Sequence, residues 1–106
     1  MDRPNILLMT SHDTGRHIGC YGVNTVRTEN LDTLASQGAM FRNYFCASPM
    51  CSPSRGAAMT GRYPQTNGMM GLCHAVWMWS LNDPRQHLFW VLREAGYDTA
   101  LIGHHH

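Results

Sequence analysis

A cysteine nucleophile and an arginine lie close together in "CSPSR", residues 51–55. Cys51 carries a thiol, and Arg55 carries a permanent planar cation whose geometry suits sulfate or phosphate. Small residues follow, and Pro53 favours the first turn of a helix, so we predict that a helix begins at or just after Cys51. The free N–H groups and positive dipole end of such a helix attract anions. The segment therefore predicts an oxyanion site that contains a nucleophile.

The longer string around Cys51 decides between this interpretation and simple packing. A lone cysteine beside an arginine is also typical of a buried small residue next to a surface charge. However, "CSPSR" followed by "MTGRYP" resembles the C-x-P-S-R signature of the type I, formylglycine-dependent sulfatases of the alkaline phosphatase superfamily. The segments "RPNILLMTSHD", "GCYG", "TENLDTLASQGAMFRNYF" and "AGYDTALIG" resemble further parts of that family, so the similarity covers nearly the whole chain.

The resemblance implies a specific chemistry for Cys51 and Arg55. It implies that Cys51 is oxidised to formylglycine by a formylglycine-generating or an anaerobic sulfatase-maturing enzyme, and that both residues are catalytic. One hydroxyl of the hydrated aldehyde attacks sulfur, and the other expels sulfate as the aldehyde re-forms. The resemblance also implies a divalent metal, usually calcium, bound in part by the modified Cys51. The expected activity is hydrolysis of a sulfuric ester or sulfamate, and "SHDTGRHIGCYG" is closer to sulfamidase-like and carbohydrate-sulfatase members than to arylsulfatases.

Two adjacent residues, His12 and Asp13, are candidate metal ligands. Asp13 matches the second of two aspartates that the resembled family commonly places after its first strand, and His12 occupies the first position. Carboxylate oxygens suit calcium, whereas imidazole suits zinc or manganese-like ions. His12 therefore leaves open a different metal, a role behind the ligands, or fewer ligands in this part of the chain. A hydrogen-bonded loop pair is the alternative that involves no metal.

The last residues, "GHHH" at 103–106, fall where the resembled family often has Gly-Lys-x-His. By that resemblance His106 matches a histidine near the leaving group. His104 replaces the sulfate-contacting lysine and is cationic only when protonated. Both are substrate-binding candidates, although three terminal histidines are equally typical of a tag remnant.

The elements that would position these residues follow from the apolar pattern. Strands are predicted for "NILLMTS", "AMFRNYFCA" and "YDTALIG", the first and last as buried strands of a parallel sheet. Helices are predicted between Thr28 and Gly38, from the Cys51 region onward, and over 85–96. An irregular surface or lid segment is predicted for residues 62–84. The order indicates an α/β fold, a layered α/β/α sandwich with a mostly parallel sheet, which by resemblance is alkaline-phosphatase-like and is incomplete here.

Composition and length restrict the partners and the extent of the domain. The 106 residues carry a formal charge of +1 without a basic block, so neither nucleic acid nor a membrane is an expected partner. No signal peptide is evident, which predicts a cytoplasmic protein with free thiols, or a periplasmic or secreted one if a leader was removed. Four cysteines would fit either case.

Members of the resembled family are several times longer than this chain. We therefore expect residues 1–106 to be the N-terminal part of a sulfatase catalytic domain, inactive alone, whose remaining ligands lie in chain that is not present. The expected substrate is a sulfated small molecule or carbohydrate. Two alternatives stay open: a phosphate or phosphonate monoester hydrolase of the same superfamily, and a non-catalytic truncated fragment.

Overall fold

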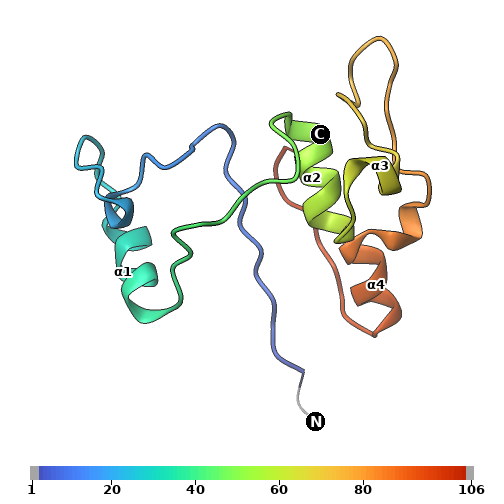
Figure 1. Cartoon of the computed structure of the whole chain (residues 1–106). Coiled ribbons are helices and arrows are strands. Elements are labelled where there is room, and N and C mark those ends of the chain that lie inside the picture. Colours follow the sequence, from blue (N-terminus) through green and yellow to red (C-terminus); the bar gives the residue numbers. More distant parts are fainter. Residues whose placement is uncertain (1–2, 105–106) are drawn as a thin grey trace. The chain divides into compact units, whose positions relative to one another are not determined.

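The computed structural model describes residues 3–104 and divides into two compact units, Met1–Tyr44 and Phe45–His106 (Figure 1). The first unit contains the 3₁₀-helix η1 (Gly19–Tyr21) and α1 (Glu29–Gln37). The second contains α2 (Cys51–Thr60), α3 (Pro64–Asn67), the 3₁₀-helix η2 (Pro84–Gln86) and α4 (Leu88–Glu94). No helix within residues 3–104 is both long and apolar enough to span a membrane.

In the first unit, side-chain hydrogen bonds hold η1 against the first turn of α1. Thr28 precedes the helix and Gly38 follows it, as predicted. The Thr28 hydroxyl accepts the N–H of Gly19 at 2.8 Å and lies 3.1 Å from the Asp32 carboxylate. The same carboxylate accepts the N–H of Cys20 at 2.6 Å. The two side chains thus satisfy backbone donors that the short η1 leaves open.

In the second unit, α2 packs against α3 and α4, and the buried amide of Asn67 fixes the end of α2. Asn67 is 1% exposed. Its Nδ2 donates to the Thr60 hydroxyl and to the Arg62 carbonyl, both at 3.1 Å. Its Oδ1 accepts the N–H of Met69 at 2.8 Å. One side chain therefore ties α2, α3 and the chain that follows α3 to one another.

The helix predicted over 85–96 is divided into η2 and α4, with His87 in an extended conformation between them. Each part has its own side-chain cap: Asp83 accepts the N–H of Arg85 at 3.0 Å, and His87 accepts the N–H of Phe89 at 3.2 Å. The hydrogen bond from the Arg85 guanidinium lowers the pKa of the Asp83 carboxyl. Local capping has replaced the continuous helical ladder that the apolar spacing predicted.

The stretch between α3 and η2, which we call the 68–83 segment, contains no regular helix or strand, as predicted, whereas α3 lies in the earlier part of residues 62–84, which were also predicted to be irregular. Figure 1 shows it as a loop that leaves α3 and returns toward η2. A side chain at Gly71 would place its Cβ 2.6 Å from Cδ1 of Trp79, so the indole lies directly against the glycine backbone. The lack of a side chain at Gly71 allows this close approach.

The three predicted strands are wrong for this chain, since residues 3–104 contain helices, turns and irregular segments but no strand. The segments concerned expose their apolar side chains: Leu7 is 84% exposed, Phe45 84% and Ile102 93%. A strand requires a neighbouring strand for its N–H and C=O groups and a packed face for its side chains. The described residues supply neither, so the predicted α/β/α sandwich stays a prediction for a longer protein.

The interior of the second unit is made of small and polar side chains around α2. The buried face of that helix consists of Ser52, Pro53, Gly56 and Ala57. Among the described residues, Ala57 is the buried hydrophobic one, at 8% exposed. Hydrogen bonds and helix caps therefore hold this unit together with little help from an apolar core.

Candidate active site around Cys51

The helix predicted from Cys51 is confirmed, because α2 begins at that residue. Met50 precedes it in an extended conformation, and its carbonyl accepts the N–H of Ser54 at 3.0 Å. The first three helical residues have no intrahelical acceptor for an N–H group, so Pro53 at the third position forfeits no hydrogen bond. The motif thus suits a helix start, and it leaves the N–H groups of Cys51 and Ser52 directed at the helix terminus.

Cys51 and Arg55 share one face of the first turn of α2. Both residues are half-buried, and residues four apart on a helix are neighbours on its surface. The two residues between Cys51 and Ser54 are buried instead: Ser52 is 1% exposed, and Pro53 is among the fully buried side chains. A thiol and a guanidinium are therefore presented together at a helix N-terminus, which is the arrangement that an anion requires. Their catalytic roles stay predictions.

A cavity of about 340 Å³ within the second unit is lined in part by Arg55. It is mostly apolar, and its lining includes Ser52, Arg55, Met69, Cys73 and His87. A Cβ on Gly56, also in the lining, would lie 3.0 Å from the Met69 Cβ, so a glycine permits this close packing. The 68–83 segment therefore forms one wall of a cavity that reaches the first turn of α2.

Ser52 and Cys73 form a contact for which the sequence gives no signal, since 21 residues separate them. The Ser52 hydroxyl lies 3.5 Å from the Cys73 sulfur and accepts the N–H of Cys73 at 3.3 Å. His74 directly follows Cys73, and its Nδ1 lies 3.9 Å from the Cys73 sulfur. All four cysteines are free thiols.

His12 and Asp13 lie together in the first unit, with 3.5 Å between Nε2 of His12 and Oδ2 of Asp13. Their side chains are 54% and 85% exposed. Within residues 3–104 no group of three potential metal ligands comes together. The exposed carboxylate of Asp13 has the oxygen donors that a hard cation prefers, whereas the imidazole of His12 does not. These residues fit a divalent cation as part of a ligand set, and their metal roles stay predictions.

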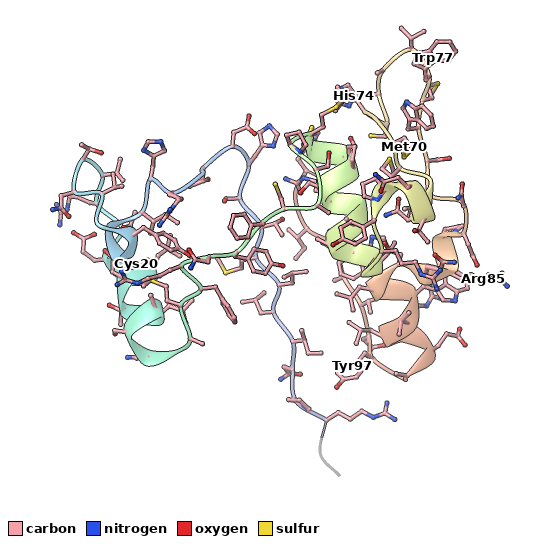
Figure 2. All side chains as sticks on the ribbon, viewed as in Figure 1. Cys20, Met70, His74, Trp77, Arg85 and Tyr97 are labelled. Atoms are coloured by element: carbon pink, nitrogen blue, oxygen red, sulfur yellow. The ribbon has the colours of Figure 1, made fainter. Side chains whose placement is uncertain are left out.

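The terminal histidines add little to the site geometry. His104 is exposed and belongs to the second unit, and its substrate role stays a prediction. His106 lies outside the described residues. Figure 2 displays the side chains of the described residues and labels His74 within the 68–83 segment.

Comparison with known proteins gives the family. The sulfatase family model matches residues 4–106. The chain is 42% identical to human steryl-sulfatase over 98% of its length, and 38% identical to human N-acetylgalactosamine-6-sulfatase over 97%. It is 34% identical over 98% to an N-acetylglucosamine-6-O-sulfatase of Bacteroides thetaiotaomicron. No solved structure matches the chain.

The chain belongs to the sulfatase family, which confirms the resemblance carried by the Cys51 motif. It spans 19%, 22% and 18% of the lengths of these three relatives, respectively. The sequence therefore corresponds to a fragment of a family-length protein.

Proposed function

We propose that residues 1–106 are the N-terminal part of a catalytic domain that hydrolyses sulfate esters or sulfamates. The observation that carries this proposal is the position of Cys51 as the first residue of α2, inside a motif and a chain that match the sulfatase family. A nucleophile at a helix N-terminus meets the positive end of the dipole and open N–H groups, which favour a tetrahedral anion. The activity belongs to the longer protein, whose sheet completes the α/β fold.

Arg55 and the first turn of α2 bind the sulfate group in this proposal. The guanidinium lies one turn from residue 51 and offers a planar pair of N–H donors to two sulfate oxygens. Asp13 supplies carboxylate oxygen to a divalent cation, with calcium as the proposed ion. A formylglycine formed from Cys51 would supply a hydrated aldehyde as nucleophile, and a bound divalent cation would supply Lewis-acid chemistry.

The substrate class that we propose is a sulfated carbohydrate. Two of the relatives compared above are named for sulfated amino sugars, and one is named for a steryl sulfate. An exposed aromatic ring on the 68–83 segment supports the sugar: Trp77 is 79% exposed. Indole rings present a flat apolar face with a polar N–H at the edge, which suits a sugar ring.

The test uses the family-length protein purified from its native host. We expect mass spectrometry of the Cys51 peptide to show formylglycine, and we expect turnover of 4-nitrophenyl sulfate and of N-acetylglucosamine 6-sulfate. Cys51→Ala should abolish turnover by removing the nucleophile, whereas Cys46→Ala, at an exposed thiol outside the motif, should retain it.

Two results would contradict this function. Faster turnover of 4-nitrophenyl phosphate than of the sulfate would favour a phosphate or phosphonate monoester hydrolase. An unmodified thiol at residue 51, together with no turnover of any ester, would identify a non-catalytic protein.

A further inference from the structure

The buried hydroxyl of Ser52 links the start of α2 to the 68–83 segment. It accepts the N–H of Cys73 at 3.3 Å and lies 3.5 Å from the Cys73 sulfur, a distance at which it donates to sulfur. Ser52 is 1% exposed, so water does not compete for these hydrogen bonds. A buried hydroxyl without them would pay its full desolvation cost. The contact is therefore a fixed attachment point.

The same segment is fixed at both of its ends by Asn67. The Asn67 carbonyl accepts the N–H of Asn82 at 2.8 Å, and its Oδ1 accepts the N–H of Met69 at 2.8 Å. Ser52 adds a third attachment in the interior of the segment, at Cys73. These three hydrogen bonds to residues of α2 and α3 hold the middle of an otherwise irregular loop in place.

The attachment at Cys73 brings His74 to the start of α2. Ser52 directly follows Cys51 in the sequence, and Cys73 directly precedes His74. His74 is exposed, and Figure 2 shows its side chain toward the end of α2 at which the helix begins. An imidazole donates from one ring nitrogen and accepts at the other, so it can hydrogen-bond a sugar hydroxyl in both directions.

We propose that Ser52 is a positioning residue that holds the 68–83 segment beside residue 51, so that His74 recognises a hydroxyl of the sugar released by the enzyme. This inference rests on the function proposed above and deepens it. Arg55 and the helix terminus bind the sulfate group, which all substrates share. His74 contacts the leaving group, which differs between substrates, and it therefore affects specificity more than the chemical step.

The attachment itself is tested by thiol reactivity, without any enzyme assay. Iodoacetamide is added to the chain, and peptide mass spectrometry follows alkylation of Cys73 relative to the exposed Cys46. Ser52→Ala should raise the relative rate at Cys73 about tenfold, because loss of one buried hydrogen bond frees the loop by about that factor. Ser52→Thr keeps the hydroxyl and should restore the slow rate, and Ser80→Ala, at an exposed serine, should leave it unchanged.

An unchanged relative rate at Cys73 in Ser52→Ala would overturn the attachment. An increase at Cys20 of the first unit as large as that at Cys73 would also overturn it, because general unfolding would then explain the change. Ser52→Thr separates these cases, since it alters packing but keeps the hydrogen bond.

Specificity is tested with the family-length protein on two sulfates. N-acetylglucosamine 6-sulfate has hydroxyls on its leaving group, whereas 4-nitrophenyl sulfate has none. His74→Ala should raise KM for the sugar sulfate about tenfold and leave KM and kcat for 4-nitrophenyl sulfate unchanged. His74→Gln, which still donates and accepts, should restore most of the sugar affinity. Ser52→Ala should shift the sugar KM in the same direction, with the formylglycine content of each variant measured in parallel.

The possible failures are distinguishable. A wild-type protein that turns over neither sulfate refutes the proposed function. A wild-type protein that turns over both, with no selective change in His74→Ala, refutes the recognition by His74 alone. Equal losses on both substrates at full formylglycine content would place His74 in the chemical step and would likewise overturn its assignment to the leaving group.

Discussion

At the residue scale, Asn67 carries more of the local structure than any charged group near it. Its amide uses both donor hydrogens and its oxygen on three different partners while being 1% exposed. The sequence "RYPQTNG" predicted no such role, because asparagine before glycine is typical of a turn. Asn67 can hydrogen-bond to Thr60 and Arg62 only because α3 folds back on the end of α2.

We expect Asn67→Asp to destabilise the second unit by about 2 kcal/mol. The aspartate has nearly the same shape, but its second oxygen cannot donate to the Thr60 hydroxyl and would face the Arg62 carbonyl. Urea unfolding followed by circular dichroism measures the change. Gln65→Glu, the same chemical exchange at an exposed position of α3, should cost little, and equal losses in the two variants would contradict the prediction.

The residues of the Cys51 motif show how much of the site could be predicted from sequence. The helix start at Cys51 and the first-turn position of Pro53 follow from local rules, and α2 confirms them. The pair Ser52 and Cys73 could not be predicted, since a contact across 21 residues leaves no periodic pattern.

At the element scale, a glycine directly follows both α1 and α2. Gly61 ends α2 with φ of 64°, and its N–H donates to the Ala57 carbonyl at 2.8 Å. Gly38 ends α1 as predicted, but its φ of −125° is open to other residues. The division between η2 and α4 was missed because His87 caps α4 with its own side chain, a role that spacing of apolar residues does not reveal.

Gly61→Ala should destabilise α2 by about 1 kcal/mol, because an L-residue pays for the left-handed conformation. Gly61→Asn should cost less, since asparagine tolerates that region better. Thermal unfolding by circular dichroism of the two variants and the wild type provides the comparison. A loss in Gly61→Asn as large as that in Gly61→Ala would show that space, and not backbone conformation, governs the position.

At the scale of the whole molecule, there is a physical reason why residues 3–104 do not form the predicted sheet. Helices form from contacts within a few residues, so 106 residues suffice for them. Strands need partners that are remote in sequence, and this chain spans 19% of human steryl-sulfatase. Residues 5–11 and 97–103 have the apolar pattern of buried strands, but the described residues form no neighbouring strand for either segment.

These uncovered segments predict that the isolated chain self-associates. Leu7, Phe45 and Ile102 are 84%, 84% and 93% exposed, and such apolar surface is removed from water when chains meet. Analytical ultracentrifugation should show a weight-average mass that rises with concentration. The double variant Leu7→Asp, Ile102→Asp should weaken this rise, whereas Thr99→Asp, at an exposed polar position, should not. A concentration-independent monomer would contradict the prediction.

The contact between Gly71 and Trp79 makes Trp79 an intrinsic fluorescence probe of the 68–83 segment. Indole emission depends on the polarity of the surroundings and on nearby quenching groups. The Trp79 ring lies against the backbone of Gly71, within the 68–83 segment. Movement of Gly71 away from Trp79 changes the surroundings of the indole before any helix unfolds. A red shift of intrinsic fluorescence on a single-tryptophan background would thus register the earliest loosening of the loop without an added dye.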